Sequence, residues 1–128
     1  MTNTPHILIV DDHADYASLI SDYLISKGYR TSVASDGHSG LALISELRPA
    51  LVLMDIQMPQ MDGIAAIQHI RADTCLRQIP VIALTALAMT GDRERCLDAG
   101  ADEYVSKPIG LRALAEIIAR HLMHRSAA

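Results

Sequence analysis

The chain has 128 residues, of which 50% are hydrophobic, so it is long enough to form one domain with a buried core. It has no Trp and no Phe, and the predicted core is therefore aliphatic. A net charge of -4 without a basic run argues against direct binding to nucleic acid. No stretch reaches the length of a membrane span and the two cysteines lack CxxC spacing, so we expect a cytoplasmic protein with free thiols.

The first half of the chain alternates strand and helix patterns. Residues 7–10 form an unbroken apolar run, which is typical of a strand buried on both faces of a parallel sheet. Apolar residues spaced by three and four predict a helix over 16–24, which Gly28 ends. A weaker strand pattern follows at Arg30–Ala34, and a second helix is predicted over 40–47.

The second half continues the alternation. Apolar runs predict buried strands at 51–54 and 81–84, with a helix over 64–70 between them. A weaker strand pattern at 103–105 is followed by the last predicted helix, over 111–122.

The stretch MTGDRERCLDAG, residues 89–100, has helix formers and a glycine stop but few apolar residues. We expect a thinly packed helix there, which can shift at a modest cost in free energy. The alternation as a whole predicts an α/β fold, a doubly wound parallel sheet of five strands with five helices. No linker or repeat divides the chain, so residues 1–128 are predicted to form a single domain with its core at about 5–123 and short frayed tails.

Polar side chains follow four of the predicted strands. Asp11 and Asp12 come after the first strand, Asp55 after the third, Thr85 after the fourth and Lys107 after the fifth. The carboxyl ends of parallel strands meet at one edge of a sheet, where ligands bind in open α/β folds. Each residue alone has an ordinary explanation, as a helix cap, a strand residue or a surface charge. Their occurrence together predicts a ligand-binding site at this edge of the sheet.

The composition of this site indicates a metal and a phosphate. Three carboxylates at one place repel one another unless a cation neutralises them. Such oxygen ligands suit Mg²⁺, which commonly binds one or two carboxylates together with waters and phosphate oxygens. Lys107 is one of only two lysines in a chain with nine arginines, and its compact charge suits a phosphate.

Four motifs carry a resemblance to a known family: ILIVDD, LVLMDIQMPQMDG, PVIALTA and DAGADEYVSKPI, in this order. With them the chain resembles the receiver domain of two-component response regulators over nearly its whole length. The resemblance implies the flavodoxin-like strand order 2-1-3-4-5. It also implies that Asp55 is the phosphoacceptor, a carboxylate that takes a phosphoryl group from the phosphohistidine of a histidine kinase or a histidine phosphotransfer protein. Such a domain catalyses its own phosphorylation and slow dephosphorylation but is not a dedicated enzyme.

The resemblance further implies a set of metal ligands. Asp12 and Asp55 would bind Mg²⁺ or Mn²⁺ directly, Asp11 would act through a water, and the backbone carbonyl of Gln57 would complete the protein ligands. The metal would balance charge between the attacking carboxylate and the incoming phosphoryl oxygens. His13, which follows the acid pair, is predicted to have a loop role instead of a catalytic one.

The resemblance also implies phosphate contacts and a switch. Lys107 would bind one phosphoryl oxygen, Thr85 would donate its hydroxyl to another, and Ala86 would leave access to the group. Thr85 would then move toward the phosphoryl group while Tyr104 turns inward, a two-state change that alters the face made by the fourth helix, the fifth strand and the last helix. A protein target would bind that face. The bond between Lys107 and Pro108 is often cis in this family.

Several alternatives remain beside this interpretation. A Mg²⁺-dependent phosphatase commonly has a second Asp two residues after its nucleophile, where this chain has Gln57. A flavin-binding module needs a hydroxyl- and glycine-rich loop after the first strand, and DDHADY offers carboxylates there. A receiver-like interaction domain without phosphorylation is disfavoured because all the site residues are present. The sequence does not separate a stand-alone regulator from a receiver of a hybrid histidine kinase or phosphorelay, a lineage that MDIQMPQMDGIAAIQHIR and PVIALTA resemble.

Overall fold

The structure, a computed structural model, describes residues 4–58, 62–86 and 90–127, with side chains up to residue 123. Over these residues the chain forms five strands and five helices in strict alternation. The strands are β1 (His6–Val10), β2 (Arg30–Ala34), β3 (Leu51–Asp55), β4 (Val81–Thr85) and β5 (Glu103–Ser106). The helices are α1 (Ala14–Ser26), α2 (Gly37–Leu47), α3 (Gly63–Ala72), α4 (Asp92–Ala99) and α5 (Leu111–Ala127). Each predicted strand lies inside an observed one.

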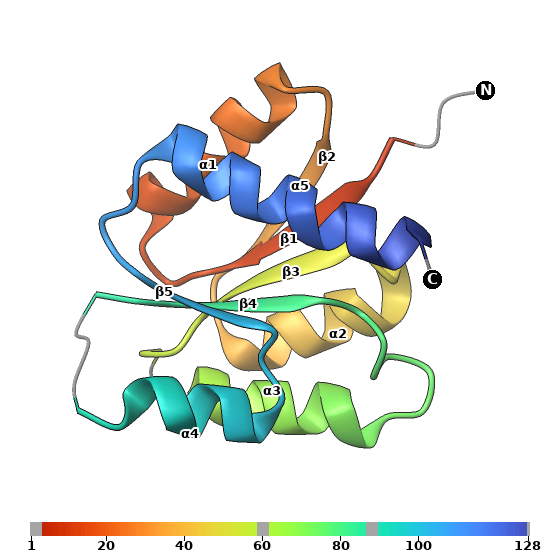
Figure 1. Cartoon of the computed structure of the whole chain (residues 1–128), viewed down its shortest axis with the longest axis vertical. Coiled ribbons are helices and arrows are strands. Elements are labelled where there is room, and N and C mark those ends of the chain that lie inside the picture. Colours follow the sequence, from red (N-terminus) through yellow and green to blue (C-terminus); the bar gives the residue numbers. More distant parts are fainter. Residues whose placement is uncertain (1–3, 59–61, 87–89, 128) are drawn as a thin grey trace.

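The sheet is parallel throughout, in the order β2-β1-β3-β4-β5, which confirms the predicted doubly wound fold (Figure 1). The chain passes from β1 to β2 and then crosses to the other side of β1 to form β3. The register aligns Val10 with Met54 and Asp55 with Leu84. The three central strands therefore end at one edge, at the point where the strand order reverses and where α/β proteins bind ligands.

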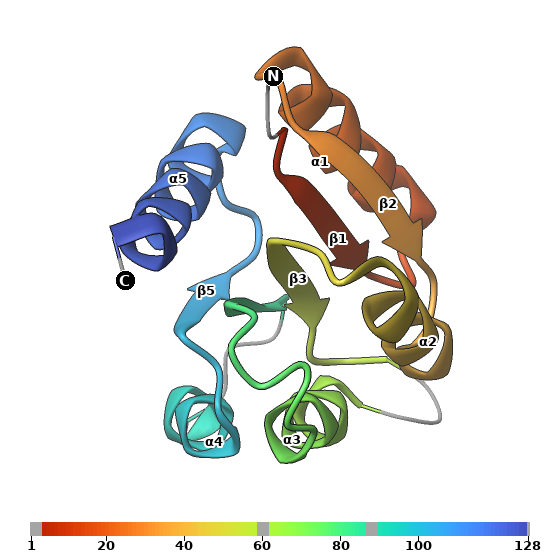
Figure 2. The ribbon, with the colours of Figure 1, turned by 90° about the vertical axis from the view of Figure 1, so that its right-hand side faces the viewer.

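Helices cover both faces of this sheet, as Figure 2 shows. Successive residues of a strand point to opposite faces, and both faces of β1 and β3 are apolar. One core cluster joins Ile7, Ile9, Leu51 and Leu53 to α1 and α5, and the other joins Leu8, Val10, Val52 and Met54 to α2, α3 and α4. Burial on both faces explains why these strands are continuous apolar runs in the sequence.

The α4 helix is anchored thinly, as the sequence predicts. Cys96 is the only buried residue among the eight of α4, whereas α3 buries four. Four charged residues, Asp92 to Arg95, directly precede Cys96 in the sequence, yet its side chain lies in the core. Burial raises the pKa of the Cys96 thiol to about 11, so the group stays protonated and unreactive at neutral pH. Both cysteines are free, as predicted, and Cys75 is exposed.

Arg71 ties α3 to the amino end of β4 and to the turn that follows α4. Its guanidinium donates to the carbonyl oxygens of Gly100 and Ile79, each at 2.8 Å. It also donates to Oδ2 of Asp102 at 2.8 Å, and the same oxygen accepts the N–H of Val81 at 2.8 Å. This network lies at the opposite end of β4 from the predicted site, so its role is to stabilise the fold.

The last helix is longer than the sequence pattern predicts. The apolar spacing ends at Leu122, but α5 continues to Ala127, so the tail that was expected to fray is helical. The physical reason is that no Gly or Pro follows Leu122 to end the helix. Among the residues that the structure describes, no helix has the length and apolarity that crossing a membrane requires.

Candidate functional site

The carboxyl ends of the strands bring the predicted site residues together. Asp55 is the last residue of β3 and Thr85 the last of β4, whereas Asp11 directly follows β1. All three are buried, with 1% of each residue exposed. Backbone bonds hold this rim, because the N–H of Asp11 donates to Ala34 and the N–H of Lys107 donates to Thr85. Asp11, Asp55, Thr85 and Lys107, four polar residues far apart in the sequence, thus share one edge of the sheet.

A fourth potential ligand joins the three acids. Carboxylate oxygens of Asp11, Asp12 and Asp55 and a ring nitrogen of His13 all lie within 4.8 Å of one another. Nδ1 of His13 is 3.2 Å from Oδ1 of Asp11, 3.2 Å from Oδ1 of Asp12 and 3.9 Å from Oδ2 of Asp55. The sequence pattern predicts only a loop role for His13. The available signal was its position directly after the acid pair, where the chain turns into α1.

Asp55 is the most perturbed group at this rim. Its Oδ1 accepts the N–H of Gln57 at 3.1 Å, while its buried Oδ2 accepts no hydrogen bond from the described residues. Burial raises the pKa of the Asp55 carboxyl to about 6, and the neighbouring Asp11 charge adds to the rise, against the opposing effect of Lys107. A buried oxygen without a partner costs free energy that a bound cation would offset.

Lys107 reaches the acids from the other side of the rim. Its Nζ is 2.7 Å from Oδ2 of Asp11 and 3.6 Å from Oδ2 of Asp55. The same atom lies 4.9 Å from the centre of the Tyr16 ring, and only 8% of the lysine side chain is exposed. The peptide bond between Lys107 and Pro108 is cis. The ammonium is therefore held at the acids by charge and by an aromatic face.

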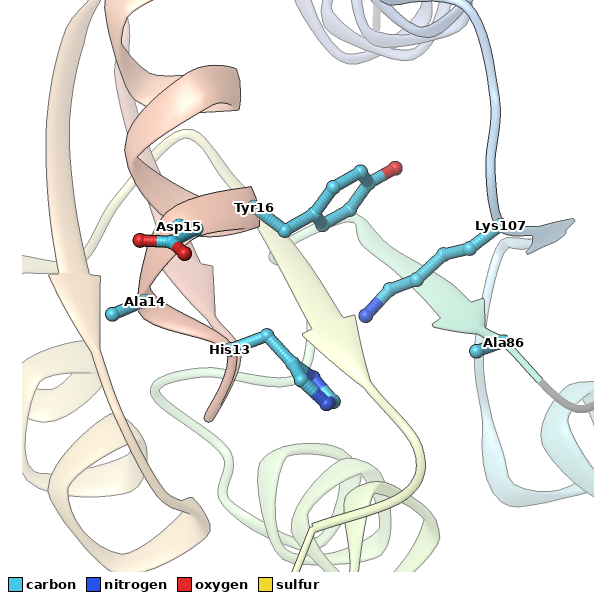
Figure 3. Close-up of a pocket in the computed structure, with 6 residues that line it drawn as sticks. All are labelled: His13, Ala14, Asp15, Tyr16, Ala86 and Lys107. Atoms are coloured by element: carbon cyan, nitrogen blue, oxygen red, sulfur yellow. The ribbon is translucent and has the colours of Figure 1, made fainter.

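A cavity of about 520 Å³ opens beside these groups. It is lined by His13, Ala14, Asp15, Tyr16, Ala86 and Lys107. Figure 3 shows His13 and Tyr16 extending from the start of α1, and Lys107 extending toward them from the end of β5. Ala86 is small and exposed, so it leaves this entrance open. The cavity thus lies next to Lys107 and His13, two residues whose side-chain nitrogens contact the acids.

The loop after Asp55 is fixed at its far end by α3. Asp62 caps that helix, because its Oδ1 accepts the N–H of Ala65 at 2.8 Å. The N–H of Gly63 donates to the carbonyl oxygen of Ile56 at 2.9 Å. A Cβ at position 63 would collide with the backbone oxygen of Asp55 and lie 2.7 Å from Cα of Ile56, so only glycine fits. Residues 59–61, the Pro-Gln-Met of the second motif, lie outside the described residues.

Tyr104 lies on the strand next to Thr85. The register pairs Tyr104 with Ala83 and Ser106 with Thr85. The ring of Tyr104 packs against the core cluster on the α3 and α4 side, and burial raises the pKa of its hydroxyl. Tyr104 is therefore partly buried already in this structure.

The response regulator receiver domain family matches residues 7–119 of the chain. The chain belongs to this family. The site at the carboxyl ends of β1, β3, β4 and β5 is accordingly the acidic pocket of a receiver domain, where members of the family bind Mg²⁺ and accept phosphoryl groups.

Proteins and solved structures similar to this chain support its assignment to the receiver domain family. The polar-differentiation response regulator DivK of Brucella anthropi is 40% identical over 116 residues, covering 91% of this chain and 94% of DivK. A CheY-like receiver domain protein of Methanospirillum hungatei has a TM-score of 0.92 at 30% identity, with 98% of each chain covered. The receiver domain of a sensor histidine kinase from Pseudomonas aeruginosa has a TM-score of 0.86 at 38% identity, covering 93% of this receiver domain and 98% of that one. That structure holds a magnesium ion in its active-site cleft.

Proposed function

We propose that this receiver domain accepts a phosphoryl group on Asp55. In the reaction, a carboxylate oxygen of Asp55 forms a bond to the phosphorus of a phosphohistidine, and the bond between that phosphorus and the ring nitrogen breaks. The leaving imidazole takes up a proton, and Asp55 becomes an acyl phosphate. The observation that carries the proposal is Oδ2 of Asp55, which is buried without a hydrogen bond from the described residues, beside Lys107 and the acid pair.

The metal ligands are proposed residue by residue. Asp12, Asp55 and the backbone carbonyl of Gln57 would bind Mg²⁺ or Mn²⁺ directly, and Asp11 would act through a water. The donor set fits a hard cation, because it consists of oxygens and one of them, on Asp55, has no hydrogen bond from the described residues. A bound divalent ion supplies positive charge between the carboxylate and the phosphoryl oxygens, which would otherwise repel each other.

The phosphoryl group would be held by residues of the neighbouring strands. Lys107 would exchange part of its contact with Asp11 for a phosphoryl oxygen, and Thr85 would donate its hydroxyl to another. Ala86 keeps the approach open because its side chain is small. Positioning and charge neutralisation are the main contributions that a protein makes to phosphoryl transfer.

A change at Thr85 would be transmitted to the surface through Tyr104. Thr85 ends β4 and Tyr104 lies on the adjacent strand β5. A movement of the Thr85 side chain would therefore change how the Tyr104 ring packs. The face that responds is made by α4, β5 and α5, and α4 buries only Cys96. Glu103 of β5 contacts His121 of α5 at 2.8 Å, so β5 and α5 are linked on this face. We infer that a protein target binds there.

The phosphodonor is proposed to be a histidine kinase or a histidine phosphotransfer protein. Two arrangements are supported by relatives. DivK is named as a response regulator, whereas the Pseudomonas aeruginosa domain is named as part of a sensor histidine kinase. The chain would thus act as a stand-alone regulator or as the receiver of a hybrid kinase or phosphorelay, with residues 1–128 as one receiver unit.

The test is the intact mass of the protein after incubation with acetyl phosphate, with and without Mg²⁺. We expect one phosphoryl adduct that requires Mg²⁺ and is absent from Asp55→Asn. The matched control is Asp62→Asn, which changes an acid in the same motif and retains a residue able to cap α3. An adduct that survives in Asp55→Asn would refute the assignment of the acceptor.

A further inference from the structure

The ring of His13 occupies a position that the receiver chemistry does not use. His13 is the N-cap residue of α1, but its side chain makes no capping hydrogen bond. Its backbone N–H donates to Oδ1 of Asp11 at 2.8 Å, which draws the residue toward the acids. The side chain is 65% exposed, yet Nδ1 faces the carboxylates of Asp11 and Asp12. The ring is therefore open to solvent on one side and directed at the metal site on the other.

The separations around Nδ1 match those of donor atoms that share one ion. Ligands about 2.1 Å from an octahedral ion lie about 3.0 Å apart when adjacent and about 4.2 Å apart when opposite. Nδ1 of His13 is 3.2 Å from an oxygen of Asp11, 3.2 Å from one of Asp12 and 3.9 Å from one of Asp55. All three distances fall close to or between these two values, so a small movement of the ring places Nδ1 among the ligands.

A second, independent observation points to a ligand at this place. Asp55 is 1% exposed, and its Oδ2 accepts no hydrogen bond from the described residues. This oxygen faces both Nδ1 of His13 and Nζ of Lys107, at 3.9 and 3.6 Å. Neither nitrogen is within hydrogen-bonding distance of this oxygen, and Nδ1 of His13 is instead 3.2 Å from Oδ1 of Asp11. A cation between the Asp55 carboxylate and the imidazole would give Oδ2 of Asp55 a partner.

We propose that His13 supplies a nitrogen ligand to the bound metal, through Nδ1, beside the carboxylates of Asp12 and Asp55. This inference rests on the proposed function, because it concerns the same metal site. Mg²⁺ favours oxygen ligands, whereas imidazole suits Ni²⁺, Zn²⁺ and other first-row metals. The site would therefore bind Mn²⁺ and Ni²⁺ with a greater advantage over Mg²⁺ than a site with oxygen ligands alone.

The experiment uses Mn²⁺ as a spectroscopic probe of the chain of residues 1–128. Pulsed electron paramagnetic resonance of bound Mn²⁺ detects a directly coordinated nitrogen. We expect this coupling in the wild type and in the control His69→Asn, whose histidine is exposed on α3, and its loss in His13→Asn. Displacement of Mn²⁺ by Ni²⁺ and by Mg²⁺ gives the metal preference, which should fall by about tenfold or more in His13→Asn.

Three other outcomes would overturn the inference, and they have different consequences. Bound Mn²⁺ that shows coupling only to water would mean that His13 donates hydrogen bonds to the acids and leaves the metal to oxygen ligands, with the proposed function intact. A nitrogen coupling that persists in His13→Asn would assign it to another residue. Failure of the wild type to bind Mn²⁺ at all would count against the metal site and the proposed function together.

Discussion

The ammonium of Lys107 is 2.7 Å from Oδ2 of Asp11 and 3.6 Å from Oδ2 of Asp55, so the lysine is paired with Asp11 and not with the proposed phosphoacceptor. The side chains of Asp11 and Lys107 are both buried, and their opposite charges offset part of the free energy that it costs to take each charge out of water. Oδ2 of Asp55, in contrast, accepts no hydrogen bond from the described residues. Removing the partner of Asp11 should therefore destabilise the metal-free protein, whereas removing the charge of Asp55 should stabilise it.

Lys107→Met should destabilise the metal-free protein by about 2–4 kcal/mol, because it leaves the charge of Asp11 buried without its ammonium partner. Urea denaturation at neutral pH with a chelator measures the change. The matched control is Lys27→Met, which alters the only other lysine, an exposed one, and should change the stability by less than about 0.5 kcal/mol. Equal small losses in the two variants would show that the pair with Asp11 contributes little.

Asp55→Asn should stabilise the metal-free protein in a pH-dependent way. The folded-state pKa of about 6 exceeds the ordinary value of 3.8, so the folded protein binds more protons than the unfolded chain between these values. The contribution of Asp55 to stability is thus fully present below about pH 4 and is lost as the pH rises through about 6. We expect Asn to add on the order of 2–3 kcal/mol at pH 8 and close to nothing at pH 4. Denaturant titrations of both proteins across this range test the slope, and a gain independent of pH would contradict it.

Mg²⁺ should raise the thermal midpoint of the wild-type protein. At ten times the dissociation constant, a ligand that binds only the folded state adds about 1.4 kcal/mol, which corresponds to a rise of several degrees. The Asp12→Asn variant should lose most of this rise, because it removes a proposed direct ligand. Differential scanning calorimetry with increasing Mg²⁺ gives both values. A rise of equal size in Asp12→Asn would remove that residue from the ligand set.

Thr85→Ala should uncouple phosphorylation from the surface change. Asp55 and Lys107 are untouched, so the variant is expected to take up a phosphoryl group, but Tyr104 would not follow it. Amide spectra of the α4 and β5 residues with and without acetyl phosphate measure the response. The shifts seen in the wild type should be reduced severalfold, and unchanged shifts would exclude Thr85 as the transmitting residue.

The sequence predicts the fold well because the strands are buried on both faces. A run such as Leu51 to Met54 cannot be an exposed loop, and its length suits a strand better than a helix. The place of the site follows from the fold, since Asp11, Asp55 and Thr85 end neighbouring strands. These inferences need only the order of elements and the rule that parallel strands end together.

The contacts between individual side chains, in contrast, do not follow from the order of the elements. No spacing rule indicates that Nζ of Lys107 is nearer to Asp11 than to Asp55, because the choice depends on the path of the chain after β5. The direction of the His13 ring depends on the turn into α1, and the burial of Cys96 depends on how α4 lies against α3. Such contacts are set by packing between elements, which local sequence patterns do not describe.

The close fit of Gly63 has a consequence for how this molecule can move. A Cβ at this position would collide with the backbone of Asp55 and Ile56, so no larger residue fits there. The start of α3 therefore lies directly against the end of β3, whereas α4 has Cys96 as its one fully buried residue, with Leu97 and Ala99 partly buried beside it. We infer that a motion triggered at Asp55 displaces the β4–α4 side more than the β3–α3 side, because the close contact at Gly63 leaves the start of α3 little room to shift.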